Sequence, residues 1–260
     1  MAPAVAQQSE AALAAAAQNP VAAMYSLPLQ NNTYLGAGPN HDKTANILNI
    51  QPVLPFTVGD WNIISRTIIP LAHLPGLSSD LPDGTPAGGL GSSQFGLGDI
   101  NQTVYFSPAA SQGLIWGVGP SINLPTATSK SLGSGKVSIG PGAVALTMPT
   151  PWVVGVLARQ LWSVAGPPDR SNVSQLLLQP FVNYNLSDGW YLVSSPVITA
   201  DWNQNPSNRW TVPVGGGAGK IFKVGGQPMN AQVQAFDYVE KPTGGPQWAI
   251  RFQLQFLFPR

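Results

Sequence analysis

Side chains able to carry out covalent chemistry are few in this sequence, and their spacing does not favour an active site. The chain has no cysteine and two histidines, His41 and His73. A hydrolase needs a serine within hydrogen-bond reach of a histidine base. Ser65 precedes His73 on the same expected strand, but at about 3.3 Å per residue the two are more than about 20 Å apart. A serine on a neighbouring strand remains open, so a lipid hydrolase is a minor alternative and we expect no enzyme.

Metal, nucleotide and nucleic-acid sites are also poorly supported. His41 and Asp42 are adjacent in a loop, where two neighbouring residues seldom converge on one ion without further ligands. The segment LGSGK lacks the flanking strand and helix of a nucleotide-binding phosphate loop. The net charge is +1 and no basic run is present. We therefore expect no cofactor, no metal and no nucleic-acid partner.

A different chemistry is indicated by polar side chains at every second position of apolar segments. In WAIRFQLQFLF, residues 248–258, polar side chains alternate with aromatic and aliphatic ones. In a β-strand these two sets face opposite sides. The same alternation elsewhere predicts a polar inner face that contacts a small-molecule solute. Its expected members are Arg66, Asp99, Asn101, Arg159, Gln179, Asn183, Asp201, Gln232, Gln234, Arg251, Gln253 and Gln255.

Both signs of charge occur on this expected inner face. Three arginines, at positions 66, 159 and 251, are set against Asp99 and Asp201. Such charges form a selective constriction in some pores. In other barrels they pair with one another and only complete a filled interior. The sequence leaves both interpretations open.

The composition indicates which kind of element positions these residues. Charged residues make up 9% of the chain, against roughly 25% in soluble domains, while the chain holds 28 glycines and 26 prolines. No apolar run approaches the roughly 18 residues of a membrane-spanning helix. A chain that crosses a membrane with strands must close them into a barrel.

Apolar β-type segments recur from Tyr25 onward, and the gaps between them alternate between tight and long. Short turns on one side and longer loops on the other are typical of outer-membrane barrels, whose short turns face the periplasm. The pattern predicts an all-β fold, a twelve-stranded antiparallel transmembrane β-barrel with a short N-terminal helix. The expected strands are 25–35, 44–55, 61–73, 95–107, 113–125, 135–148, 152–164, 174–185, 190–202, 209–222, 228–238 and 247–258.

The eight tryptophans give an independent indication of this layout. One group of four follows tight turns, and the other group flanks long loops. Two groups at opposite strand ends are typical of the aromatic girdles at membrane interfaces. The groups are Trp61, Trp116, Trp152 and Trp190, then Trp162, Trp202, Trp210 and Trp248.

The residues before the first expected strand have a composition of their own. Ala4, Val5 and Ala6 match the small-x-small pattern of a signal-peptidase site, with a disordered alanine-rich leader as the alternative. Ser9 is expected to cap a short helix over residues 10–18, and Pro20 is expected to stop it. The expected domains are a signal-peptide remnant at 1–6, a periplasmic helix or plug at 7–24, and the transmembrane barrel at 25–260.

Many strings of the sequence, in order, resemble one bacterial family. They include GLGDINQTVYFSP, LIWGVGPSINLPTAT, LLLQPFVNYNLSDGWYLVSSPVITADW and RFQLQFLFPR. From about Gln18 to Arg260 the chain resembles the outer-membrane transporter family labelled for the meta-pathway of phenol degradation, whose members are also mislabelled neuromedin U. The resemblance implies an outer-membrane barrel and a channel for small aromatic or hydrophobic compounds. It supplies no functional residues to carry over.

These observations lead to one expectation and its alternatives. We expect an outer-membrane channel for passive uptake of small aromatic or hydrophobic molecules, with both termini in the periplasm. Its expected partners are outer-membrane lipids, the small-molecule solute and the barrel-assembly machinery during insertion, since the aromatic last strand resembles the signal for that machinery. A closed structural or interaction barrel is the main alternative.

Overall fold

The structure is a computed structural model that describes residues 10–75, 93–111 and 113–259. The expected signal-peptide remnant at residues 1–6 and the capping Ser9 lie outside the described residues. Most of the expected long loop after the third strand also lies outside them. Within the described part, no helix is long and apolar enough to cross a membrane.

Helix α1 (Glu10–Gln18) precedes fifteen strand segments, which together make twelve passes along the barrel wall. The strands are β1 (Tyr25–Ala37), β2 (Lys43–Ile50), β3 (Val53–Val58), β4 (Trp61–Leu74), β5 (Gln94–Leu97), β6 (Ile100–Pro108), β7 (Leu114–Leu124), β8 (Val137–Thr147), β9 (Trp152–Ala165), β10 (Ser174–Asn185), β11 (Trp190–Ser194), β12 (Ile198–Asp201), β13 (Trp210–Val224), β14 (Gln227–Glu240) and β15 (Trp248–Phe258). A short 3-10 helix, Pro206–Asn208, precedes β13.

Three of the twelve expected strands are each broken into two segments. The second pass is interrupted at Pro52, between β2 and β3, and the ninth at Pro196, between β11 and β12. Proline lacks the N–H that a sheet ladder needs, so it interrupts the pairing there. The fourth pass is interrupted at Gly98, where a Cβ would lie 2.9 Å from Pro70 Cγ and 3.1 Å from the Leu132 carbonyl.

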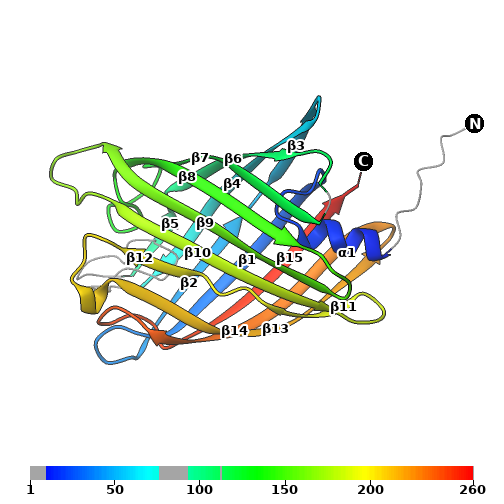
Figure 1. Ribbon diagram of the computed structural model, residues 1–260. Coiled ribbons are helices and arrows are strands. Elements are labelled where there is room, and N and C mark those ends of the chain that lie inside the picture. Colours follow the sequence, from blue (N-terminus) through cyan, green and yellow to red (C-terminus); the bar gives the residue numbers. More distant parts are fainter. Residues whose placement is uncertain (1–9, 76–92, 112, 260) are drawn as a thin grey trace, which may run out of the picture.

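The strands form one closed antiparallel sheet (Figure 1). β1 pairs with β15, with Tyr25 opposite Phe258 and Leu35 opposite Trp248. β9 pairs with β10, which completes the ring of strand pairs. The expected twelve-stranded antiparallel barrel with one short helix is therefore confirmed.

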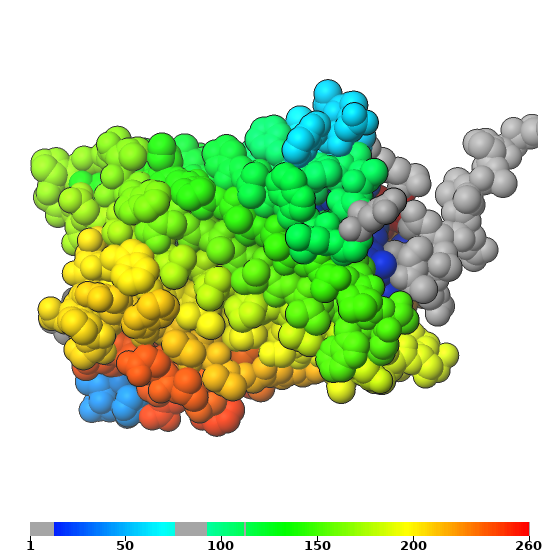
Figure 2. All heavy atoms as spheres, in the orientation of Figure 1, coloured from blue at the N-terminus to red at the C-terminus, as the bar shows by residue number. Residues whose placement is uncertain are grey.

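Side-chain alternation sets the inner and outer surfaces of this wall. Along β15, Trp248, Ile250 and Phe252 are about half exposed, whereas Arg251 is buried. The apolar residues therefore point out of the barrel, and the polar residues point into it. Figure 2 shows part of the outer surface, formed in this view mainly by the strands from β7 to β13.

The two ends of the barrel differ in their connections. Tight turns such as residues 59–60 and 225–226 lie at one end, together with helix α1 and the C-terminal end of β15 (Figure 1). Longer connections, including residues 125–136 and 166–173, lie at the other end. We call these the short-turn end and the long-loop end. The expected alternation of tight and long connections is present.

The tryptophans fall into two groups at opposite ends, as the sequence predicts. At the short-turn end, the rings of Trp61 and Trp116 are 6.1 Å apart, and at the long-loop end those of Trp202 and Trp210 are 5.6 Å apart. Strand β9 carries Trp152 near one end and Trp162 near the other, both about half exposed. Ten residues on a tilted strand span roughly 25 Å of height, which matches the apolar band of outer-membrane barrels.

Helix α1 and the residues after it pack against the inner wall at the short-turn end (Figure 1). Leu13 is fully buried among Tyr191, Val193 and Ile221, which are inward-facing residues of β11 and β13. Val21 is buried in a second apolar cluster that includes Ile64, Tyr105 and Phe181. Gln18 Nε2 donates to Asn185 Oδ1 at 2.8 Å. The segment 13–24 therefore fills part of the barrel interior.

Candidate solute pathway in the barrel lumen

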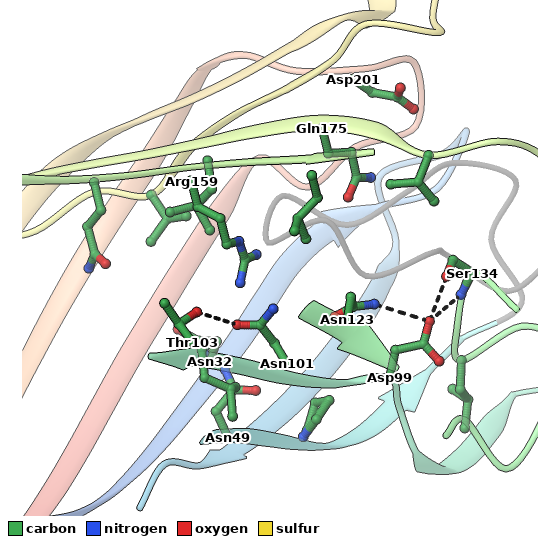
Figure 3. Close-up of a pocket in the computed structure, with 18 of the residues that line it drawn as sticks. Asn32, Asn49, Asp99, Asn101, Thr103, Asn123, Ser134, Arg159, Gln175 and Asp201 are labelled. Atoms are coloured by element: carbon green, nitrogen blue, oxygen red, sulfur yellow. Dashed lines mark hydrogen bonds between the residues drawn. The ribbon is translucent and has the colours of Figure 1, made fainter. Parts of the chain in front are cut away.

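The barrel encloses a cavity of about 890 Å³ that extends from mid-height to the long-loop end (Figure 3). Strands β1, β4, β6, β9, β10 and β15 all contribute side chains to it. Seven of the predicted inner-face residues line this cavity. They are Arg66, Asp99, Asn101, Arg159, Gln179, Asp201 and Arg251.

A second cavity, of about 170 Å³, lies at the short-turn end between the wall and residues 16–24. It is lined by the predicted residues Asn183, Gln232, Gln253 and Gln255, together with Arg66 and Gln179. The two cavities share one set of lining residues, which form a ring between them. The ring consists of Gln30, Gln51, Arg66, Leu157 and Gln179.

One predicted residue, Gln234, lies in the wall rather than on a cavity surface. It is 1% exposed, and its Oε1 accepts hydrogen bonds from Ser195 N at 3.0 Å and Ser195 Oγ at 3.1 Å. Ser195 precedes Pro196, where the backbone between β11 and β12 leaves the sheet ladder. Gln234 therefore satisfies polar groups that the interrupted strand leaves without sheet partners.

Arg66 lies in the ring between the two cavities. Its Nη2 donates to Gln51 Oε1 at 2.6 Å. Gln51 immediately precedes Pro52, at the break between β2 and β3, so its side chain turns inward against the strand that carries Arg66. Arg66 and Arg159 both line the larger cavity, as does Tyr105. Two cations that are far apart in the chain therefore face one cavity.

Arg251 is held more firmly than Arg66. Its Nε donates to Asn32 Oδ1 at 2.9 Å, and its Nη1 donates to the Ser195 carbonyl at 2.8 Å. Its guanidinium carbon lies 4.9 Å from the centroid of the Phe236 ring. The side chain is 7% exposed. Arg251 thus links β15, β1 and the break after β11 across the inner wall.

Asp99 fixes the loop 125–136 at the long-loop end. Its Oδ2 accepts from Ser134 N at 2.7 Å and from Ser134 Oγ at 2.8 Å, as Figure 3 shows. Leu132 of the same loop is fully buried in an apolar cluster with Tyr34, Ile47 and Tyr238. The loop therefore folds into the barrel rather than extending away from it.

Arg170, in the neighbouring loop, holds loop 125–136 from the other side. Its Nε donates to the Ser134 carbonyl at 3.0 Å, and its Nη2 donates to the carbonyls of Lys130 and Gly133. Lys136 Nζ donates to the Pro167 carbonyl at 2.6 Å. Two loops are thus joined by charge-assisted hydrogen bonds. The loop sequence PPDRSN, residues 167–172, does not by itself indicate this role of Arg170.

Asp201 lies at the end of β12 and closes its own loop. Its Oδ1 accepts from Asn203 N at 3.0 Å, and its Oδ2 accepts from Gln204 Nε2 at 3.3 Å. Three of the predicted charges thus make hydrogen bonds to amide, hydroxyl or backbone groups: Arg66 to Gln51, Arg251 to Asn32 and Ser195, and Asp99 to Ser134. Ion pairs between described side chains occur in the loops, as in Lys130–Asp169 at 3.9 Å.

His73 and Ser65 lie apart on β4. His73 faces outward and is exposed, beside Asn46 of β2 and Phe95 of β5, whereas Ser65 accepts from Gln102 Nε2 at 2.9 Å. The described residues contain no cluster of three or more histidine, cysteine or acidic side chains arranged to hold a metal ion.

Comparison with solved structures identifies similar folds. The crystal structure of an outer membrane channel from Pseudomonas putida F1 gives a TM-score of 0.67 at 14% sequence identity, over 92% of this chain and 97% of that one. The β-domain of the Bordetella autotransporter BrkA gives 0.47 at 11% identity, over 91% of this chain and all of that one. No family model and no curated protein matches the sequence. The fold is thus that of an outer-membrane β-barrel, and the more specific family resemblance stays a prediction.

Proposed function

We propose that this protein is an outer-membrane channel through which small molecules diffuse passively. The observation that carries the proposal is the polar cavity of about 890 Å³ inside a closed barrel, which meets a second cavity at a shared ring of residues. A barrel that served only as a scaffold would gain nothing from so large a polar interior. The likeness in fold to a solved outer membrane channel supports the same function.

The outer surface and the connections support the location and the orientation. Exposed apolar side chains and two groups of tryptophans suit a lipid bilayer with an interface at each end. Short turns face the periplasm in outer-membrane barrels, so we place α1 and the C-terminal end of β15 there. The long-loop end, with the larger cavity, then faces the outside of the cell.

Aromatic or hydrophobic solutes are the class that we propose for transport. The family resemblance implies such compounds, and the larger cavity combines its polar groups with apolar side chains, among them Ile68, Leu161 and Leu177. A pathway of this kind suits a solute with one polar group on an apolar body.

A flux assay in liposomes tests the proposal. Purified full-length protein should admit small aromatic acids, phenols or sugars faster than protein-free vesicles, and no flux for any of them would contradict a channel. Gln179→Trp places a large ring where the two cavities meet, so it should reduce flux strongly. Val182→Trp makes the same change on the outer face of the same strand and should leave flux unchanged.

One observation favours the alternative of a closed structural barrel. Residues 13–24 occupy the short-turn end, with Leu13 and Val21 buried. If this segment closes the lumen permanently, vesicles would show no flux with or without Gln179→Trp. Flux that Gln179→Trp abolishes would exclude the closed barrel.

A further inference from the structure

The middle of the larger cavity carries positive charge. Arg66 on β4, Arg159 on β9 and Tyr105 on β6 all line it. Figure 3 shows the Arg159 side chain projecting from its strand into the cavity, on the side of Asn101 and Thr103. Guanidinium groups with planar, forked donors match the geometry of a carboxylate.

The carboxylates of the described residues that line the cavity lie nearer its rim. Asp99 accepts from Ser134 at the long-loop end, and Asp201 accepts from its own loop. Arg66 is level with Thr103 in the β4–β6 pairing, and Asp99 is roughly 13 Å further along that strand. Asp169, the third acidic residue of the lining, is 3.9 Å from Lys130 in the loops. Among the described residues, the charged side chains that line the cavity at mid-height are therefore those of arginines.

Apolar side chains flank Arg159 on the same surface. Leu157 and Leu161 precede and follow it on the inner face of β9, and Leu177 is directly opposite it on β10. All three line the cavity. A carboxylate at Arg159 would thus have its apolar body next to leucines, where few water molecules screen the charge.

Small residues on the inner face of β8 make room for Tyr105 at this point. A Cβ added to Gly142 would lie 3.4 Å from Tyr105 Cε1 and 3.2 Å from Thr103 Cγ2. Gly142 is opposite Arg159 in the β8–β9 pairing. Tyr105 is 1% exposed, so it packs against the wall beside the arginines rather than across the lumen.

We propose that Arg66 and Arg159 bind the carboxylate of the permeating solute. Leu157, Leu161 and Leu177 contact the apolar body of that solute. The solute class is then a small monocarboxylate with an aromatic or branched aliphatic body. This inference rests on the proposed channel function and specifies its solute.

Planar bilayers with the full-length protein test this assignment. Benzoate is the probe, with benzyl alcohol as its neutral analogue, acetate as a carboxylate of small body, and chloride as an inorganic anion. Benzoate should bind within the channel, measured as a saturable change in single-channel current, and should bind more tightly than any of the other three. Its reversal potential in a potassium benzoate gradient should show preference for the anion.

Single substitutions separate the charge from the apolar contact. Arg159→Gln and Arg66→Gln should each weaken benzoate binding about tenfold, because each removes hydrogen bonds to a charged group. Leu177→Ala should weaken benzoate binding while leaving acetate binding unchanged. Lys220→Gln is the matched control: it removes one positive charge from the outer face, 4.8 Å from the Trp190 ring, and should change neither. Arg159→Lys keeps the positive charge and is the conservative variant. Heat-modified mobility on gels checks that each variant is folded.

The outcomes distinguish the two proposals. No current in potassium chloride would contradict the channel itself. Normal current in potassium chloride, with benzoate and benzyl alcohol changing the single-channel current equally, would overturn the carboxylate site without contradicting the channel function. Binding of chloride as tight as that of benzoate would show a general anion site and would also overturn the assignment. Loss of benzoate binding in both arginine variants, with folding and chloride current retained, would establish it.

Discussion

The long-loop half of the lumen holds a cavity of about 890 Å³, whereas the short-turn half holds one of about 170 Å³. Both halves contain a segment from outside the barrel wall. In the long-loop half, loop 125–136 is held at the wall by Asp99 and Arg170. In the short-turn half, residues 13–24 pack across the interior through buried leucine and valine side chains. Loop 125–136 buries Leu132 against the wall and leaves the larger cavity beside it, whereas residues 13–24 pack into the interior and only the smaller cavity is left there.

The largest effect should come from releasing the segment in the short-turn half. Leu13→Asp places a carboxylate in the apolar cluster of Tyr191, Val193 and Ile221, where burying a charge costs several kcal/mol. The helix should leave the wall, and single-channel conductance should rise several-fold in planar bilayers. Ala23→Asp, at an exposed position of the same segment, should leave conductance unchanged. Equal conductance in both variants would show that residues 13–24 do not limit the flow.

The next effect concerns the wall that both halves share. Arg251→Met removes the donors to Asn32 and to the Ser195 carbonyl and leaves these buried acceptors with only longer hydrogen bonds, from Gln30 at 3.4 Å and Gln179 at 3.5 Å. We expect the free energy of unfolding to fall by about 3 kcal/mol, measured by urea titration in detergent micelles. Lys223→Met, at an exposed position near the end of β13, should change it little. Similar urea unfolding midpoints for the two variants would mean that Arg251 does not stabilise the barrel.

A smaller effect is expected in the long-loop half. Asp99→Asn weakens the bonds from Ser134 N and Oγ, each worth about 1 kcal/mol or more to a charged acceptor. Loop 125–136 should then fluctuate, which would appear as added noise in single-channel current. Asp169→Asn removes only an exposed ion pair with Lys130, which contributes about 0–1 kcal/mol. No added noise in the single-channel current of Asp99→Asn would show that the hydrogen bonds of Asp99 are not needed to hold loop 125–136.

The smallest effect is expected at the wall below helix α1. Tyr191→Phe removes the bond from the Tyr191 hydroxyl to Asn230 Oδ1, at 2.6 Å. The free energy of unfolding should fall by about 1 kcal/mol. Tyr184→Phe, on the outer face beside Trp152, should have no measurable effect. A larger loss in Tyr184→Phe than in Tyr191→Phe would contradict the assignment of inner and outer faces.

The number of passes and their faces were predictable because they rest on local patterns. Alternation along 248–258 placed Arg251 and Gln255 inside and Phe252 outside, since successive side chains of a strand point to opposite faces. The breaks in three strands were not predicted, although Pro52 and Pro196 mark two of them. The expected strands 44–55 and 190–202 run through these two prolines, whereas in the structure the ladder is interrupted there and Gln51 and Ser195 make inward bonds.

The sequence by itself determined the class of fold, the polar inner face and the position of helix α1 at residues 10–18. These features depend on composition, on a period of two residues and on helix-ending signals, all of which are local. Only the tertiary structure decided which inward side chains meet. Closure of the barrel brings Arg66 and Arg159 to one cavity, Leu132 into the long-loop end and Val21 into the short-turn end. Such contacts join residues far apart in the chain, so they depend on strand register and closure, which no local pattern specifies.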